Sequence, residues 1–263
     1  MTRTLEELRE YLVGHWKFDN NFLDTSGNGN HGVPTDIEWN PTARGLKPKV
    51  LNRITCPSVH GNKLLSEFSI FAWVTVPTSN SASIISHGKD GTSGGYGYLL
   101  THGLSSWEIG RLGIYYSSPD GDSYVRTPFD INYDENTFHF LGVTFNQGVF
   151  KFYLDGQCID SIVKNATSVE FSDTIDTYIG REYSGTGGVG IYKGIFGSIY
   201  DYEIALTDDE VLALYNSTKN AVGVRPAERS FTHRLQPEVD ANTVAAFDMS
   251  TKNSDGTLMD LSW

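Results

Sequence analysis

The chain has 263 residues, a net charge of −12 and a pI near 4.9, so it can bury one sizeable core but repels nucleic-acid phosphates. Its 14 Tyr, 14 Phe, 5 Trp and 27 Gly favour short strands joined by tight turns over a helical bundle. We therefore expect an all-β protein without a nucleic-acid partner. An acidic surface also suits divalent cations, although net charge can serve solubility alone.

The first residues, MTRTLEELREYLVGHW, contain neither an apolar signal core nor a small-residue cleavage site. No apolar run reaches the length of a membrane span, so we expect no membrane insertion. The predicted location is extracellular or on a virion surface, reached after signal removal or by lysis of the producing cell. The two cysteines, Cys56 and Cys158, leave open one disulfide or two inert buried thiols.

A short helix is predicted at the start of the chain, within a lead-in segment at residues 1–11. Thr4 and Glu7 have the spacing of a capping box, just before Leu8. This pattern predicts a helix over residues 4–11 that leads into the main domain.

Strand patterns fill the main domain, which we place at residues 12–216. Alternating apolar, β-branched and aromatic residues predict strands at 68–76, 138–145, 149–156, 158–164, 177–182 and 194–205. Asn146-Gln147-Gly148 and Asp155-Gly156 predict tight turns, so residues 138–164 form a meander. The stretch 86–127 is rich in Gly, Ser, Asp and Tyr, as binding loops are, and glycine flexibility alone explains it equally well.

A second helix is predicted near residues 207–216, with Thr207 as its N-cap and Glu210 at the third helical position. The polar, proline-punctuated stretch that follows predicts a linker at 217–242.

Residues 243–263 form a C-terminal extension that repeats part of the N-terminal pattern. Val244–Asp248 followed by Asp260-Leu261-Ser262 resembles the pattern of residues 13–26. The extension is the start of a second repeat, a strand that docks on a neighbour, or a coincidental strand. Because an apolar strand favours pairing with a sheet edge, we expect an assembly arm and a homo-oligomer or larger virion assembly.

Five ordered motifs carry a family resemblance over about residues 12–216. They are VGHWKFDNNFLDTSGNGNHG (13–32), FSIFAWV (68–74), LGVTFNQGVFKFYLDG (141–156), YIGRE (178–182) and GSIYDYEIALTDDEVLALY (197–215). With them the sequence resembles laminin-G-like domains of the concanavalin-A-like lectin/glucanase superfamily. The resemblance implies an antiparallel jelly-roll β-sandwich of two sheets, one of them concave, in which the first and last strands lie side by side.

The resemblance also implies a structural calcium ion where Asp19 comes near Asp201. The predicted ligands are Asp19, Asp24, Asn28 and Asp201, since calcium requires several oxygen ligands at once. The alternative is a turn in which these side chains bond to their own backbone. Between Ile204 and Ala205 the chain lacks about three residues that relatives carry, which weakens the transfer at Asp201 most.

No catalytic residues are predicted, and the chain is not expected to be an enzyme. In the laminarinase-like branch of this superfamily's glucanases, the catalytic carboxylates lie on one strand as ExDxxE or ExDxE, because alternate residues share a face. The one Glu-x-Asp here, Glu238-Val239-Asp240, lies in the expected linker. The 7 histidines are dispersed and form no zinc motif.

Aromatic residues are the candidates for ligand binding, because their faces stack on sugar rings. The predicted ligand-binding residues are Tyr96, Tyr98, Trp107, Tyr116 and Tyr124. The alternative for each is ordinary strand packing, and of the adjacent Tyr115 and Tyr116 at most one faces a given side.

These patterns predict a non-catalytic, lectin-like adhesion module that recognises glycan or another cell-surface ligand, for example as a bacteriophage virion appendage or decoration protein. The first alternative is a purely structural assembly protein that binds its neighbours through the C-terminal arm. The second is a glycoside hydrolase or lyase with an unrecognised site.

Overall fold

The computed structural model describes residues 2–40, 45–76, 83–87, 97–102, 110–128, 137–181, 192–221, 247–252 and 258–260. The chain divides into two compact units, Met1–Gly223 and Val224–Trp263. Among the described residues, neither helix is long and apolar enough to cross a membrane.

The first unit is built from antiparallel strands with a helix near each end. The helical elements are α1 (Leu5–Leu8), a 3-10 turn (Arg9–Tyr11) and α2 (Asp208–Thr218). The strands are β1 (Leu12–Trp16), β2 (Val33–Asn40), β3 (Gly45–Cys56), β4 (Leu64–Leu65), β5 (Glu67–Thr75), β6 (Ser83–His87), β7 (Tyr98–His102), β8 (Leu112–Ser118), β9 (Gly121–Arg126), β10 (Phe138–Asn146), β11 (Val149–Leu154), β12 (Gln157–Val163), β13 (Val169–Glu170), β14 (Thr177–Ile179) and β15 (Phe196–Tyr202).

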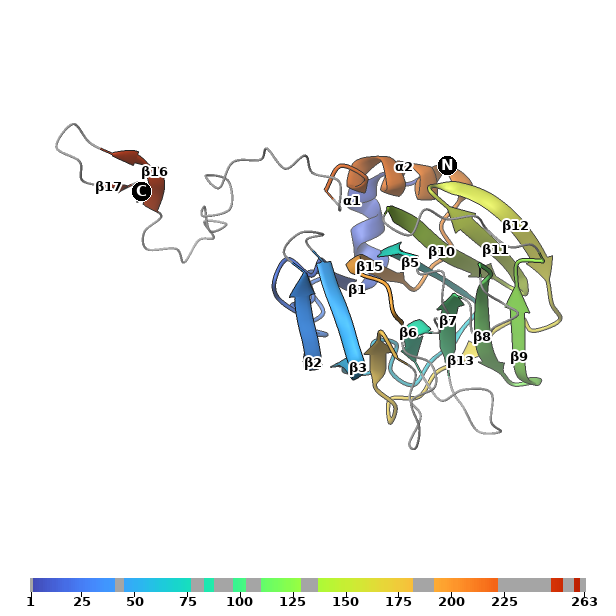
Figure 1. Cartoon of the computed structure of the whole chain (residues 1–263). Coiled ribbons are helices and arrows are strands. Elements are labelled where there is room, and N and C mark those ends of the chain that lie inside the picture. The colour runs from blue at the N-terminus through green and yellow to red at the C-terminus, as the bar shows by residue number, and fades with distance from the viewer. Residues whose placement is uncertain are drawn as a thin grey trace. The chain divides into compact units, whose positions relative to one another are not determined.

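The main strands pair in the order β12-β11-β10-β5-β15-β3-β14-β6-β7-β8-β9, with β1 on β15 and β2 on β3. One residue pair, Phe196 with Leu46, joins β15 to β3, and the strands fold there into two layers (Figure 1). We call β12-β11-β10-β5-β15-β1 the first sheet and β2-β3-β14-β6-β7-β8-β9 the second sheet. Tyr116 of β8 contacts Phe150 of β11 with ring centroids 4.8 Å apart, so the sheets face each other. The predicted antiparallel β-sandwich is confirmed.

Strand β5 shows why the domain has two hydrophobic layers. Its inward residues, among them Phe68 and Ile70, lie in the core between the sheets, and its outward residues Phe71 and Trp73 lie in a second cluster. Both faces of this central strand are buried, which explains its nearly continuous apolar sequence.

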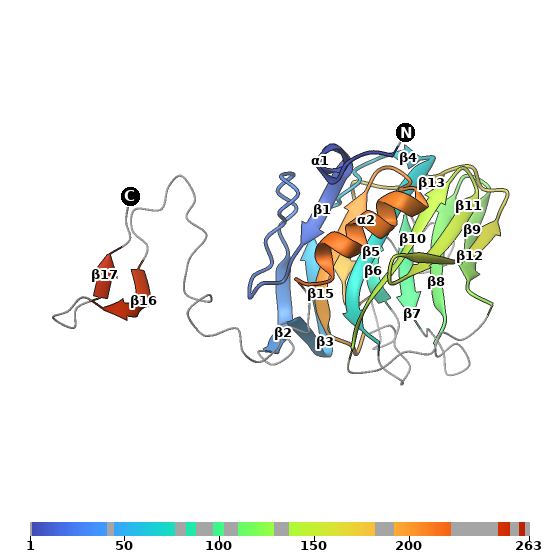
Figure 2. The ribbon, with the colours of Figure 1, turned by 90° about the horizontal axis from the view of Figure 1, so that it is seen from above.

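Helix α2 covers the second cluster by lying across the outer face of the first sheet (Figure 2). Val211 and Leu214 are its buried apolar residues. Tyr215 stacks on Trp73 at 5.5 Å, and the Trp73 indole N–H donates to Thr218 Oγ1 at 2.9 Å. One outer face of the sandwich is therefore largely occupied by the protein's own helix.

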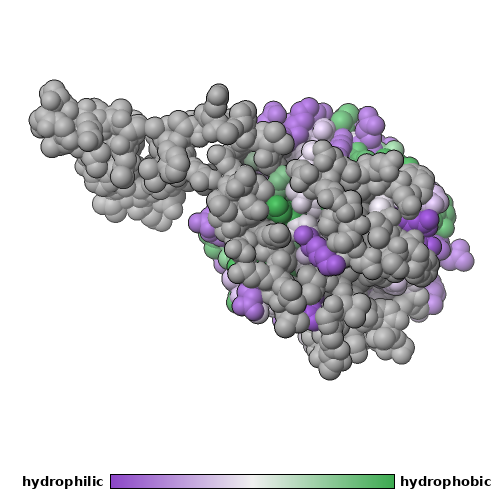
Figure 3. Space-filling view, in the orientation of Figure 1, coloured by the Kyte–Doolittle hydropathy of each residue, from purple (hydrophilic) through white to green (hydrophobic). Residues whose placement is uncertain are grey.

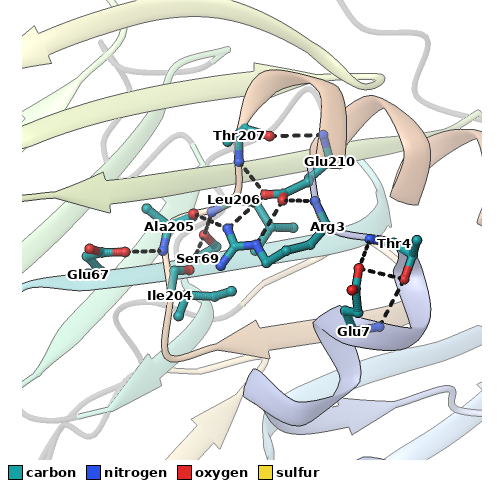
Figure 4. Close-up of polar contacts among 10 residues, drawn as sticks. All are labelled: Arg3, Thr4, Glu7, Glu67, Ser69, Ile204, Ala205, Leu206, Thr207 and Glu210. Atoms are coloured by element: carbon teal, nitrogen blue, oxygen red, sulfur yellow. Dashed lines mark hydrogen bonds and ion pairs between the residues drawn. The ribbon is translucent and has the colours of Figure 1, made fainter. Parts of the chain in front are cut away.

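Both predicted capping boxes are confirmed. Thr4 with Glu7 caps α1, and Thr207 with Glu210 caps α2. Arg3 joins the two helix starts, because its Nε lies 2.8 Å from Glu210 Oε1 and its backbone N–H donates to the same oxygen (Figure 4). The N-terminal segment is thus fixed to the last helix of the domain.

The predicted strands and turns are present with small shifts in their ends. At the predicted turn, Asp155 and Gly156 have φ of 49° and 82°, both in the left-handed region. Helix α2 extends to Thr218 and so enters the segment predicted as a linker, 217–242. The stretch 86–127, predicted to be loop-rich, contains strands β7, β8 and β9. Strands β2 and β3 were not predicted.

The two cysteines do not form a disulfide. Cys56 is buried and Cys158 is exposed. The prediction of two free thiols is therefore confirmed, but that of two buried ones is wrong, because Cys158 lies on β12, an edge strand of the first sheet.

The described residues of the second unit form an antiparallel pair, β16 (Phe247–Lys252) with β17 (Leu258–Asp260). Its residues Phe247 and Asp260 belong to the two segments in which the N-terminal pattern recurs, and the two residues are paired with each other.

Candidate functional site

Asp24 organises the loop that follows β1. Its Oδ1 accepts from the backbone N–H groups of His15 and Ser26 at 2.9 and 2.8 Å. Its Oδ2 accepts from the Ser26 hydroxyl at 2.8 Å and from the Asn30 N–H at 2.9 Å. Asp24 is 6% exposed, so its buried carboxylate is satisfied by three donors from its own loop and one from β1.

Asn28 lies in the same loop, while Asp19 is exposed at its edge. The Asn28 amide donates to Leu12 O at 2.8 Å and to Ser26 Oγ at 3.1 Å. A calcium ion requires several side-chain or backbone oxygens that point toward one place. The side chain of Asn28 instead donates hydrogen bonds, and that of Asp24 already accepts them from the protein. Among the described residues, no group of three Asp, Glu, His or Cys side chains is placed to hold a metal. As placed, the predicted ligands do not fit one calcium site, and calcium stays a prediction.

Asp201, the fourth predicted ligand, lies inside the sandwich. The pairing of β1 with β15 places Gly14 opposite Asp201, as expected for adjacent first and last strands. The Asp201 carboxylate is fully buried and accepts a hydrogen bond from the Tyr98 hydroxyl of β7. Its other oxygen lies 3.2 Å from Nε2 of His60, an ion-pair contact rather than an aligned hydrogen bond.

We call Tyr98, Asp201, His60 and Glu203 the buried clamp, because they connect the two sheets through the core. His60 Nδ1 lies 3.5 Å from Glu203 Oε1, and Glu203 also pairs with Lys63. Burial alone lowers the pKa of His60, but Asp201 and Glu203 outweigh it and raise the pKa to about 9. His60 is therefore a buried cation at neutral pH. Burial and Asp201 raise the pKa of Tyr98 well above its ordinary value.

Two of the predicted ligand-binding tyrosines lie in the core. Tyr98 is 2% exposed and stacks on Phe68 at 5.6 Å, and Tyr116 is 4% exposed against Phe150. Strand packing, the alternative at both positions, is what the structure shows. Tyr96 and Trp107 lie outside the described residues.

Tyr124, the remaining predicted residue, faces outward from the second sheet. It pairs with Tyr115 across β8 and β9, and the two rings stack with centroids 4.1 Å apart. Both side chains are partly exposed. Tyr115 occupies this face because Leu112, Ile114 and Tyr116 alternate with it and point into the core.

The stacked pair ends a row of paired residues that crosses the second sheet. From β14 to β9 the paired residues are Tyr178, Ser86, Leu99, Tyr115 and Tyr124. At the other end of the row, the Arg53 guanidinium lies 4.8 Å from the centroid of the Tyr178 ring. The usual strand spacing places Tyr178 and Tyr115 roughly 14 Å apart. We call this row, with Arg53, the tyrosine face.

Tyr115, Tyr178 and Arg53 are parts of this face that sequence reasoning missed. The alternation of Leu112, Ile114 and Tyr116 was the signal that could have selected Tyr115 over its neighbour. Arg53 and Tyr178 lie on strands distant in sequence, and no local pattern joins them.

The family is established by a match to the model of the concanavalin A-like lectin/glucanases superfamily over residues 52–212. This chain belongs to that superfamily. A search of curated proteins finds no match.

Solved structures with the same fold include domain 4 of AbnA, an extracellular arabinanase from Geobacillus stearothermophilus, in complex with arabinotriose. It is 18% identical with a TM-score of 0.59, and the match covers 78% of this chain and 98% of that one. The binding domain of Paraclostridial Mosquitocidal Protein 1 is 19% identical, with a TM-score of 0.63 and coverage of 81% and 53%. The ligand binding domain of botulinum neurotoxin serotype D, in complex with N-acetylneuraminic acid, is 13% identical with a TM-score of 0.61 and coverage of 81% and 52%. This chain spans about half of each of the two toxin chains. These likenesses show the fold.

Proposed function

We propose that this chain is a non-catalytic module that binds glycan or another cell-surface ligand through the tyrosine face. The observation that carries the proposal is the stacked, partly exposed pair of Tyr115 and Tyr124 on the second sheet. Tyrosine offers a large apolar ring with a hydroxyl at its rim, the combination that sugar rings with alternating C–H and O–H groups require.

The arrangement of the rest of the domain supports this choice of face. The outer face of the first sheet carries α2 over its apolar side chains, which removes them from contact with a ligand. On the second sheet, Tyr115 and Tyr124 are partly exposed at one end of the cross-strand row, whereas Tyr178 at the other end packs beside Arg53 and is itself buried. Rigid strands hold these rings in register, which lowers the entropy cost of binding an extended ligand.

The comparisons support the ligand class by analogy. An arabinanase domain with this fold was solved with arabinotriose, and a neurotoxin domain with N-acetylneuraminic acid. A module of this kind acts on a cell or particle surface, and we propose a bacteriophage virion as one such setting. The acidic charge of −12 does not favour nucleic acid as the ligand.

A glycan array probed with the wild-type protein and with Tyr115→Ala and Tyr124→Ala tests the proposal. Loss of a stacking ring is expected to weaken binding about tenfold, which corresponds to about 1.4 kcal/mol. Tyr11→Ala, which removes an exposed tyrosine of the 3-10 turn, is the matched control and should bind as wild type does. Absence of glycan binding by the wild type overturns the glycan assignment, and equal binding by the Tyr115→Ala variant overturns the choice of the tyrosine face. Turnover of a bound glycan would instead establish a glycoside hydrolase or lyase.

An assembly role for the C-terminal unit is a second proposal. The pairing of β16 with β17 makes a two-stranded sheet, which is marginally stable alone and gains stability by adding a strand from a neighbour. Light scattering of the whole chain and of a chain ending at residue 223 tests this. Loss of an oligomer on truncation supports it, and two monomers refute it.

A further inference from the structure

The outer face of the first sheet changes character along its strands. On β10 and β11, Phe140 and Tyr153 belong to the apolar cluster beneath α2. Further along the same face come Thr144 and Lys151, which are paired with each other, and then Asn146. Because side chains of one face recur every second residue, the strands carry an apolar half and a polar half. The helix covers the apolar half.

The segment between β15 and α2 crosses this face at the border of the two halves. The Ser69 hydroxyl donates to Ile204 O at 2.7 Å and accepts from the Leu206 N–H at 2.9 Å (Figure 4). The Ala205 N–H donates to Glu67 at 3.3 Å. These bonds fix the segment over β5, so β10 and β11 remain uncovered beyond it.

A groove of about 790 Å³ lies between this segment and the turn that joins β10 to β11. Its volume is within the range of small-molecule sites. It is lined on the strand side by Thr144, Asn146, Gln147, Val149 and Lys151, and on the other side by residues 205–209.

The charges in the groove are mostly compensated. Lys151 Nζ lies 2.8 Å from Asp208 Oδ1, and the Tyr153 hydroxyl donates to the same oxygen at 2.7 Å. Hydrogen bonds from Lys151 and Tyr153 lower the pKa of Asp208, which is therefore ionised and paired at neutral pH. Asp209 adds a further negative charge, so the lining does not attract an anion.

What the groove offers is a set of hydrogen-bonding side chains around a small apolar surface. The exposed amides of Asn146 and Gln147 both donate and accept, the exposed hydroxyl of Thr207 can donate, and Val149 and Ala205 contribute apolar atoms. Thr144 is buried beneath them and bonds to the Tyr153 hydroxyl. Vicinal hydroxyls and C–H groups of a sugar match this lining, and a charged ligand does not.

We infer that this groove is a second binding site, separate from the tyrosine face, for a neutral saccharide. It stands on the first sheet and uses amide and hydroxyl hydrogen bonds in place of ring stacking. The ligand class is the one in the proposed function, but the site shares none of its residues.

NMR titration of the ¹⁵N-labelled whole chain with arabinotriose, maltotriose and the anionic 3′-sialyllactose tests the inference. A neutral trisaccharide is expected to shift the amide signals of residues 144–151 and 205–209. Asn146→Ala should weaken this binding at least fivefold. Asn216→Ala, an exposed asparagine at the other end of α2, is the matched control and should not change it.

The Tyr115→Ala variant separates the two sites. If it retains the shifts in the groove, the second site is independent of the tyrosine face. Shifts confined to the tyrosine face refute the second site and leave the proposed function standing. Shifts confined to the groove support the second site and refute binding through the tyrosine face. Absence of groove shifts with both neutral trisaccharides, or stronger binding of 3′-sialyllactose there, also refutes the inference.

Discussion

The buried clamp predicts a loss of stability at alkaline pH. His60 gains a raised pKa in the folded state, about 9 against an ordinary 6.5. A raised pKa means that the folded protein holds the proton more tightly than the unfolded chain does. The stability that this proton contributes is complete below pH 6.5 and is lost as the pH rises through about 9. The difference corresponds to roughly 3 kcal/mol of unfolding free energy, of which about 2.5 kcal/mol disappears between pH 7 and 9.5.

Other groups also titrate in this range, so the measurement needs a variant that lacks only the clamp's charges. The double variant His60→Gln/Asp201→Asn keeps polar side chains at both positions and retains Cys56, whose thiol pKa is raised by burial. Urea unfolding followed by tryptophan fluorescence gives the free energy of each protein from pH 7 to 9.5. The wild type should lose about 2 to 3 kcal/mol more than the double variant does.

The same titration has a direct signature at one residue. The imidazole carbon signals of His60 should move with a midpoint near pH 9, while those of His87, whose pKa burial lowers to about 3, should stay constant. Parallel stability profiles for the wild type and the double variant, or a His60 midpoint near its ordinary value, would refute the reasoning.

Three further predictions concern single positions. Asp24→Ala removes the acceptor of four hydrogen bonds and should lower the free energy of unfolding by about 3 kcal/mol in urea unfolding. The calcium prediction is tested on the wild type: a melting temperature that rises with Ca²⁺ and falls with EDTA supports it, and no shift refutes it. Cys158 should react with a thiol reagent in the native protein and Cys56 only after unfolding, a difference that mass spectrometry detects. Gly142→Ala should lower stability by about 2 kcal/mol or more in urea unfolding, since a Cβ there meets the Phe71 ring, and a neutral effect would contradict the packing.

Much of the fold was predictable because its signals are local. The alternation in 138–164 and the positive-φ turn at Asp155-Gly156 specify the meander without reference to the rest of the chain. The capping boxes at Thr4 and Thr207 likewise lie within four residues of the helices that they start. Strands β2 and β3 were not predicted because Pro34 and Pro48 interrupt their patterns. Proline fits a paired strand only at particular positions, and the tertiary structure, not the local sequence, determines which positions those are.

The site was less predictable because it depends on which face a residue occupies and on what lies across the core. Choosing Tyr116 rather than Tyr115 was an error of one position on a strand, and one position exchanges the core for the surface. Asp201 was predicted beside Asp19 from the pairing of the first and last strands. That pairing is correct, but it places Gly14 opposite Asp201. Its carboxylate instead contacts Tyr98 and His60, neither of which any sequence pattern connects to β15.

The clamp and the tyrosine face share strand β7, and this links stability to recognition. Tyr98 binds Asp201 across the core, while the next residue along the strand, Leu99, is paired with Tyr115. The hydrogen bond from Tyr98 to Asp201 holds β7 on its core side and so supports the register that places the Tyr115 ring beside the Tyr124 ring. Asp201, one of the predicted metal ligands, is thus buried and bonded to the strand next to the proposed binding site.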